Sequence, residues 1–414
     1  MVKKNKMKGK HQILSLSFLS IITFACSLFS EPPIEVPLPT EEILPTEVFV
    51  PEPNPEPEQA EIPASGLPIG VVAEKNGILS LFDSEGYTLA EVNTLGISYA
   101  GQIDTHIAGV LGPEGRKFPV IYFSFEQNTS LLFTHAGQAT TLLSIPSFSG
   151  LVGAVGEPII AYTTAEYVDN SLASRLYLGE IQTLHALAPV LRDNNAEGWG
   201  LVALAVDVDA GQSTGVWYSK RPWGIGGDIV FEPRRTLHHL ALGSGEDIEI
   251  LSVDANPSAI SENREWLAYT NADLGISAMT ILNLITGEGF SYPLEEVGDQ
   301  RGAGEASFSP SNQYIAWMEG SGWQMAEVPN FHSVIRIGDL DGNIIAQFTD
   351  TALTAVSGMN LVQRAEPVGW LDDNTLVLMV RGEHWDDVAL IKIDIPSQTP
   401  SFLAQGSFIG FLYP

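Results

Sequence analysis

FSPSNQYIAW, at residues 308–317, is the stretch of sequence that decides the fold. Its first residue, Phe308, is followed by five small or polar residues and then by Tyr314, which begins an apolar run. The same spacing recurs in ISENREW at 260–266 and in WLDDNTL at 370–376. Because Ser, Pro, Asn and Asp favour tight turns, each copy predicts a strand that ends on a buried residue, a turn and a second strand.

A second recurring pattern is a strand that ends in a glycine-containing hairpin turn, as in LALGSGE at 240–246 and LNLITGE at 282–288. Short runs of aliphatic and aromatic residues, broken by turn-forming residues, continue throughout 65–414, and no long segment has the apolar spacing of a helix. Counting strand pairs gives seven units, each with four short strands. Their second strands are expected to begin near Val71, Ile121, Ile160, Val202, Leu267, Ile315 and Val377.

Repeated sheets of this kind bury their faces only against their neighbours, so a closed ring is expected. We therefore predict an all-β fold, a seven-bladed β-propeller over residues 65–414, with six or eight blades as alternatives. The first unit opens at Ile69 with what reads as a second strand, and the chain ends in a spare apolar strand, GSFIGFLYP at 406–414. This C-terminal strand is predicted to close the ring.

The FSPSNQYIAW stretch resembles the repeat of TolB and WD-repeat-like propellers, in which a strand end, a Ser-Pro-Asp-Gly turn and an Ile-Ala strand recur. The resemblance covers roughly residues 65–414, and it is specific in the last three units and weak in the first three. The turn here is SPSN or LDDN instead of SPDG. The resemblance implies a propeller scaffold and names no ligand, because one fold can carry many functions.

The N-terminus is typical of an export signal. Residues 1–10 carry five lysines, residues 13–25 are apolar, and Cys26 follows. Thirteen apolar residues are too few to span a bilayer core of about 30 Å. The layout resembles a bacterial lipoprotein signal, although Thr23 and Phe24 depart from its usual residues before the lipid-bearing cysteine. We predict a signal peptide at 1–25 and lipidation of Cys26, with an ordinary signal peptide as the alternative.

A tether is predicted at 26–64, because residues 31–64 contain ten prolines, nine glutamates and no Lys or Arg. The expected location is the outer face of a bacterial membrane, at the cell surface or in the periplasm. After Cys26, 15 basic residues face 50 acidic ones. Such a charge repels phosphate backbones, so nucleic acid is not an expected partner. A single cysteine also excludes a disulfide framework.

Three long insertions are predicted between second and third strands, at 210–233, 320–332 and 381–387, and these loops share one face of a propeller. They combine aromatic and cationic side chains, which suit a sugar, a peptide carboxylate or an aromatic ligand. The alternative is that these aromatics only fold the loops over the channel. The candidate ligand-binding residues are Trp217, Tyr218, Lys220, Arg221, Trp223, Trp323, His332, Arg381, His384 and Trp385.

The sequence contains no G-x-S-x-G elbow, HExxH or P-loop motif, and we expect a scaffold that binds a protein, peptide or glycan without a cofactor or metal. Asp207-x-Asp209-x-Gly211 lacks the closing glutamate of a calcium loop, and His238 and His239 are expected on opposite faces of a strand. The alternative is a hydrolase or lyase that acts on cell-envelope carbohydrate or peptide at the channel mouth. Its candidate groups are Glu232, Glu383, His384, Asp386 and Asp387.

Overall fold

The computed structural model describes residues 66–93 and 120–413 with gaps, and all of them belong to one compact unit, Ala60–Pro414. The gaps are 125–128, 134–138, 145–147, 155–156, 158, 169–170, 181–182, 184–187, 194–197, 223–234, 252–254, 272–276, 296–300, 322–330 and 385. From 120 to 150 the backbone alone is described. The predicted signal peptide, Cys26 and the whole of the tether therefore lie outside the described residues.

Seven antiparallel sheets follow one another along the described chain, six with four strands and one with three. The first sheet has the order β27 (Ser407–Leu412), β1 (Gly70–Lys75), β2 (Ile78–Asp83) and β3 (Thr88–Asn93). The second contains β4 (Val120–Ser124), β5 (Thr129–Phe133) and β6 (Ala139–Ser144). The third contains β7 (Phe148–Gly153), β8 (Ile159–Val168), β9 (Ser171–Glu180) and β10 (Leu191–Asp193).

The remaining four sheets each use four consecutive strands. The fourth contains β11 (Trp199–Asp209), β12 (Gln212–Pro222), β13 (Arg235–Ala241) and β14 (Glu246–Leu251). The fifth contains β15 (Ala255–Ile260), β16 (Trp266–Asn271), β17 (Thr280–Asn283) and β18 (Gly289–Ser291). The sixth contains β19 (Arg301–Phe308), β20 (Tyr314–Ser321), β21 (His332–Asp339) and β22 (Ile344–Thr349). The seventh contains β23 (Arg364–Asp372), β24 (Thr375–Arg381), β25 (Val388–Asp394) and β26 (Thr399–Gln405).

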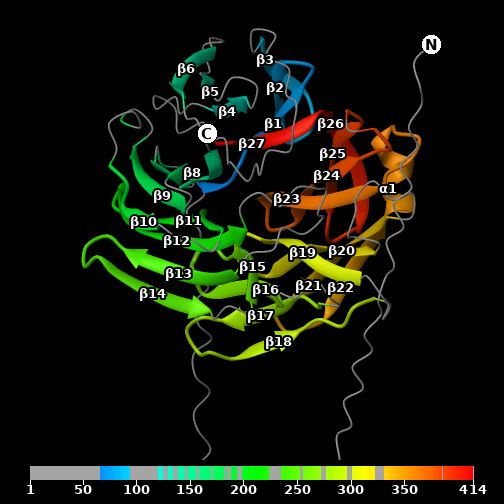
Figure 1. The fold of residues 1–414 in the computed structure, drawn as a ribbon. Coiled ribbons are helices and arrows are strands. Elements are labelled where there is room, and N and C mark those ends of the chain that lie inside the picture. Colours follow the sequence, from blue (N-terminus) through cyan, green and yellow to red (C-terminus); the bar gives the residue numbers. More distant parts are fainter. Residues whose placement is uncertain are drawn as a thin grey trace, which may run out of the picture. The chain divides into compact units, whose positions relative to one another are not determined.

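The sheets are arranged around a common centre (Figure 1), which confirms the predicted propeller. Contacts run from β27 to β4, from β7 to β11, from β11 to β15, from β15 to β19, from β19 to β23 and from β25 to β27. The buried clusters are shared between neighbouring sheets. One cluster joins Ile335 and Ile337 of the sixth sheet to Leu376 and Leu378 of the seventh. The sheet faces are therefore buried against one another, as the repeat predicts.

The C-terminal strand closes the ring as predicted. β27 pairs with β1 in antiparallel register, with Phe411 opposite Val71, and the Ile69 amide donates to the Leu412 carbonyl over 2.7 Å. The strands that begin and end the described chain thus form a single sheet (Figure 1). Phe411 is 7% exposed and packs with Val71 in the cluster between the first and seventh sheets.

The repeated turns have the conformation that their sequences predict. In the turn from β15 to β16, the Ser261 amide donates to the Trp266 carbonyl over 2.8 Å, and the Ser261 hydroxyl accepts from the Trp266 amide over 2.9 Å. The turn from β19 to β20 repeats both bonds between Ser309 and Tyr314, over 2.9 and 3.0 Å. The serine thus satisfies the backbone groups that the reversal of the chain leaves open.

One detail of the predicted strand count is wrong: Val202 lies in β11, the first strand of its sheet, so it does not begin a second strand. Ile121 lies in β4, at one edge of the three-stranded sheet, and residues 94–119 before it are outside the described part of the chain. A short helix, α1 (Asp350–Ser357), also joins the sixth sheet to the seventh. Thr349 caps its N-terminus, and Gly358 ends it with a φ of 73°.

Within the described residues, no helix has the length and apolar character needed to cross a bilayer.

Candidate functional site

A cavity of about 620 Å³ lies where the first strands of the sheets converge. It is lined by β7, β11, β15, β19, β23 and β27, one strand from each of six sheets. Most of its wall comes from the C-terminal halves of these strands, such as residues 203–208 of β11 and 306–308 of β19. The cavity therefore occupies the end of the axis where first strands turn into second strands, and we call this end the turn side.

The wall of the cavity is mainly apolar, with a few charged groups at one place. Aliphatic and proline residues line the cavity together with the aromatic residues Phe308, Phe411 and Tyr413. The charged residues of the lining are Asp207, Glu262 and Arg264. A volume in this range, an apolar wall and a few convergent polar groups are the common properties of ligand sites.

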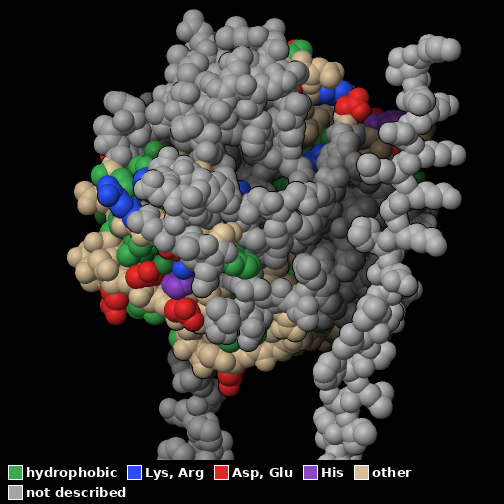
Figure 2. Space-filling view, in the orientation of Figure 1, with side chains coloured by type: hydrophobic (Ala, Val, Ile, Leu, Met, Phe, Trp, Pro, Cys, Tyr) green, Lys and Arg blue, Asp and Glu red, His purple; other side chains and the backbone are tan. Residues whose placement is uncertain are grey.

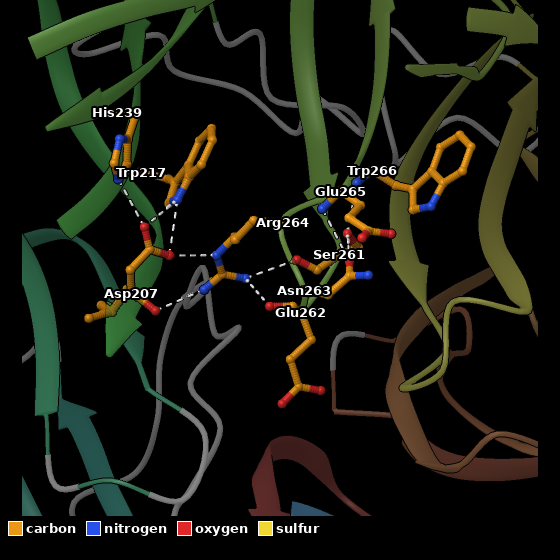
Figure 3. Close-up of polar contacts among 10 residues, drawn as sticks. Asp207, Trp217, His239, Ser261, Glu262, Asn263, Arg264, Glu265 and Trp266 are labelled. Atoms are coloured by element: carbon orange, nitrogen blue, oxygen red, sulfur yellow. Dashed lines mark hydrogen bonds and ion pairs between the residues drawn. The ribbon is translucent and has the colours of Figure 1, made fainter. Parts of the chain in front are cut away.

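Asp207, at the end of β11, organises the charged residues (Figure 3). Its carboxylate accepts from Arg264 Nε over 2.7 Å and from Trp217 Nε1 over 2.9 Å, and its Oδ2 lies 2.9 Å from His239 Nε2. Arg264 stands in the turn between β15 and β16, so its ion pair with Asp207 joins the fourth sheet to the fifth. Both side chains are about a quarter exposed.

The backbone of Arg264 has an unusual conformation. Its φ is 62°, in the left-handed region, where residues other than glycine, asparagine and aspartate are uncommon. Asn312 occupies the same position of the next repeated turn with a φ of 60°. Arg264 Nη1 donates to the Ser261 carbonyl over 2.9 Å, and its Nη2 donates to the Val206 carbonyl over 2.8 Å. The side-chain bonds therefore compensate for the strain of the backbone.

Glu262, in the same turn, extends its carboxylate away from the Asp207–Arg264 pair (Figure 3). The side chain lines the cavity and is exposed to its lumen. Its pKa is raised because the surrounding strands displace bulk water from the carboxylate, while the positive charge of Arg264 acts in the opposite direction. Burial likewise raises the pKa of Tyr413, and the negative charge of Glu262 adds to that rise.

The two histidines of β13 point in opposite directions, as predicted. His239 lies against Trp217, with 4.7 Å between ring centroids, whereas His238 stacks on Tyr218 at 4.9 Å. In the Asp207-x-Asp209-x-Gly211 segment, the Asp207 oxygens accept hydrogen bonds from the side-chain nitrogens of Trp217 and Arg264. Among the described residues, no three His, Cys, Asp or Glu side chains are grouped so that they could hold a metal ion.

Trp217 and Tyr218 were expected in a loop, and this expectation is wrong. Both lie in β12, where they are 8% and 2% exposed, because residues 212–222 continue as a strand from the tight turn at Ala210–Gly211. Tyr218 donates its hydroxyl to Asp247 over 2.7 Å, and its pKa is raised by burial first and by Asp247 second. Packing between strands therefore accounts for both aromatic residues.

Lys220 and Arg221 lie at the far end of β12. Lys220 Nζ forms an ion pair with Asp193 of β10 at 3.0 Å, which joins the third and fourth sheets. Figure 2 shows acidic side chains and a histidine over β13 and β14, and the ion pairs of His238 with Asp247 and Glu249 lie in those strands. The His238 contacts are on the outer strands of the fourth sheet, and neither they nor the Lys220–Asp193 ion pair is in the lining of the cavity.

The remaining described candidates lie at the opposite end of the axis from the turn side. Arg381 ends β24 and His332 begins β21, so both are at loops between second and third strands. His332 is 66% exposed and pairs with Asp350 at 2.8 Å, while Arg381 lies 3.9 Å from Glu366. His384 is exposed. Trp223, Trp323 and Trp385 are outside the described residues, so their proposed role remains a prediction.

Three of the four carboxylates considered for catalysis lie within the described residues, and these three are outside the lining of the axial cavity. Glu383, Asp386 and Asp387 are exposed in the short segment between β24 and β25, and none of them lines the axial cavity. Glu232 lies outside the described residues. The structure instead gathers Asp207, Glu262, Arg264 and Tyr413, which the sequence analysis did not select.

One signal in the sequence could have revealed these residues. The fourth residue of the repeated turn is Asn in SPSNQ and in LDDNT, but it is Arg264 in SENRE. An arginine where the turn favours asparagine indicates that its side chain forms a contact that compensates for the strained backbone. The partner, Asp207, is 57 residues away and belongs to another sheet, so local spacing could not identify it.

A scan against protein-family models and a search of curated proteins found no match to this chain.

Solved propellers are similar in fold. An oligogalacturonate lyase from Vibrio parahaemolyticus aligns with a TM-score of 0.51 and 12% identity, over 81% of this chain and 86% of the lyase. TolB from Acinetobacter baumannii aligns with a TM-score of 0.43 and 11% identity, over 83% and 81% of the two chains. Prolyl oligopeptidase B from Galerina marginata aligns with a TM-score of 0.47 and 9% identity, over 83% of this chain and 52% of the peptidase. At these identities the likeness concerns the fold alone, and the chain shares a distant structural similarity with TolB-like and lyase propellers.

Proposed function

We propose that this chain is an exported, membrane-tethered scaffold that binds a protein, peptide or glycan through its propeller. The observation that carries this proposal is the axial cavity of about 620 Å³, with an apolar and aromatic wall and charged groups at one end. A volume of this size suits a side chain or a short segment of a larger ligand. The lipoprotein-like signal and the acidic tether support display of the propeller outside the membrane.

Binding in place of catalysis is supported by how the polar groups are used. Asp207 and Arg264 neutralise each other and hold two sheets together, and His239 is held between Asp207 and Trp217. General acid–base chemistry on a glycoside needs two carboxylates placed on either side of the bond. In the described lining of the cavity, Glu262 is the carboxylate that no ion pair or hydrogen bond engages.

The test is to probe glycan and peptide arrays with the purified full chain and then to analyse each bound ligand by mass spectrometry. The proposal predicts at least one class of ligand that is retained and recovered intact. Shortened or unsaturated products would instead favour the hydrolase or lyase alternative. If no glycan or peptide is retained above the level of a heat-unfolded control, the proposal is wrong.

A further inference from the structure

The turn-side mouth of the axial cavity carries one negative charge that the described protein does not neutralise. We define this mouth by Asp207, Glu262, Arg264 and Tyr413. The positive charge of Arg264 is matched by Asp207, since Arg264 Nε donates to that carboxylate over 2.7 Å. The Glu262 carboxylate, by contrast, is left without an ion pair among the described residues, and it extends away from Arg264 (Figure 3).

The nitrogens of Arg264 are also engaged elsewhere. Nη2 donates to the Val206 carbonyl over 2.8 Å, and Nη1 donates to the carbonyls of Ser261 and Glu262 over 2.9 and 3.3 Å. Rotating the guanidinium toward the Glu262 carboxylate would break these bonds and leave Asp207 without its counter-ion. The unpaired carboxylate is therefore a fixed feature of this turn.

The surroundings of Glu262 suit a cation with an apolar stem. Phe308, Phe411 and Tyr413 line the same cavity, together with aliphatic and proline side chains. Lys and Arg side chains have flexible hydrocarbon stems that pack on apolar walls while the charged head stays at a polar position. Aromatic faces add attraction for an ammonium or guanidinium group. Acidic residues exceed basic ones by 30 in the whole chain, which favours the approach of cations over anions.

We propose that the turn-side mouth binds a Lys or Arg side chain of an extended peptide, with the stem in the axial cavity and the charged head on the Glu262 carboxylate. This inference rests on the proposed binding function and names the ligand class and the group that recognises it. A small free amine carries the same chemistry as a lysine side chain. The peptide is favoured because the cavity is open at Glu262 and its volume also suits a short segment around the side chain.

The test is isothermal titration of the full chain with four probes: a penta-peptide with a central lysine between glycines, its acetyl-lysine form, its glutamate form, and n-butylamine. The lysine peptide is expected to bind at least tenfold more tightly than the acetyl-lysine and glutamate forms, because both lack the positive charge. Equal affinity for the lysine and acetyl-lysine peptides would overturn the inference. Butylamine binding as tight as peptide binding would overturn the choice of a peptide.

A matched pair of variants assigns the contact to one residue. Glu262→Gln keeps the size of the side chain and is expected to weaken binding of the lysine peptide about tenfold. Glu265→Gln removes the same charge from the same turn, but Glu265 does not line the cavity. The affinity of this variant for the lysine peptide should therefore equal that of the wild type. Equal affinities of wild type and Glu262→Gln would refute the role of Glu262. The array test remains independent, because a glycan or acidic peptide retained there would support the scaffold and reject the basic ligand.

Discussion

The C-terminal strand should supply a large part of the stability of the ring, and Phe411 gives the sharpest test. Its side chain is 7% exposed, packs on Phe408 with ring centroids 5.0 Å apart, and lies over Gly369 of β23. Replacing a buried phenylalanine with alanine costs about 3–5 kcal/mol. A domain of ordinary stability has about 5–15 kcal/mol in total. Phe411→Ala should therefore remove about a fifth or more of the free energy of unfolding.

Urea unfolding of the full chain, followed by tryptophan fluorescence, measures this loss directly. Phe402→Ala on β26 is the matched control, since Phe402 is 45% exposed and its removal should cost less than about 1 kcal/mol. Deleting residues 406–414 should be more severe, because five large side chains of this segment are buried, each worth about 1.5–3 kcal/mol. If Phe411→Ala lowers stability no more than Phe402→Ala does, the C-terminal strand does not hold the ring closed.

Three further changes test separate parts of the account. Arg264→Asn keeps a residue that suits the left-handed turn, as Asn312 does, but removes the ion pair with Asp207. We expect the free energy of unfolding in urea to fall by about 1–3 kcal/mol. Wild-type stability would show that the ion pair contributes nothing. Gly369→Ala places a Cβ 2.5 Å from the Phe411 ring, at a position where the backbone φ is 142°. The free energy of unfolding should therefore fall by about 1–3 kcal/mol. An unchanged unfolding midpoint would contradict the packing of Phe411 on Gly369. Cys26→Ala should release the exported protein from membranes into the soluble fraction, as measured by fractionation and immunoblotting, whereas full retention in the membrane would refute lipid anchoring.

The architecture could be predicted because the repeat is local. The turn that links first and second strands uses hydrogen bonds within six residues, as between Ser261 and Trp266, so its sequence determines its shape. The closing strand was also predictable, because the first unit lacks a partner strand and the last segment is apolar. These features depend on neighbours in sequence and on the need to bury sheet faces.

The candidate site was less predictable, because it depends on contacts between sheets. Residues 212–222 contain Gly, Ser, Lys and Arg, which read as a loop, yet they form β12 since Trp217 and Tyr218 are buried against neighbouring strands. This error placed the two aromatics in a loop, whereas they lie in the middle of a strand. Similarly, Glu262 looks like an ordinary turn residue until β11 and β27 bring Asp207 and Tyr413 to the same cavity.

The most direct test of ligand binding in the axial cavity is photo-cross-linking from inside it. Benzoylphenylalanine replaces Phe308, which lines the cavity, or Phe402, which is exposed on an outer strand, and the full chain is irradiated with the lysine penta-peptide. The account predicts a cross-linked peptide from position 308, lost when Glu262 is also replaced with Gln, and none from position 402. Equal cross-linking from both positions, or none from position 308, would contradict it.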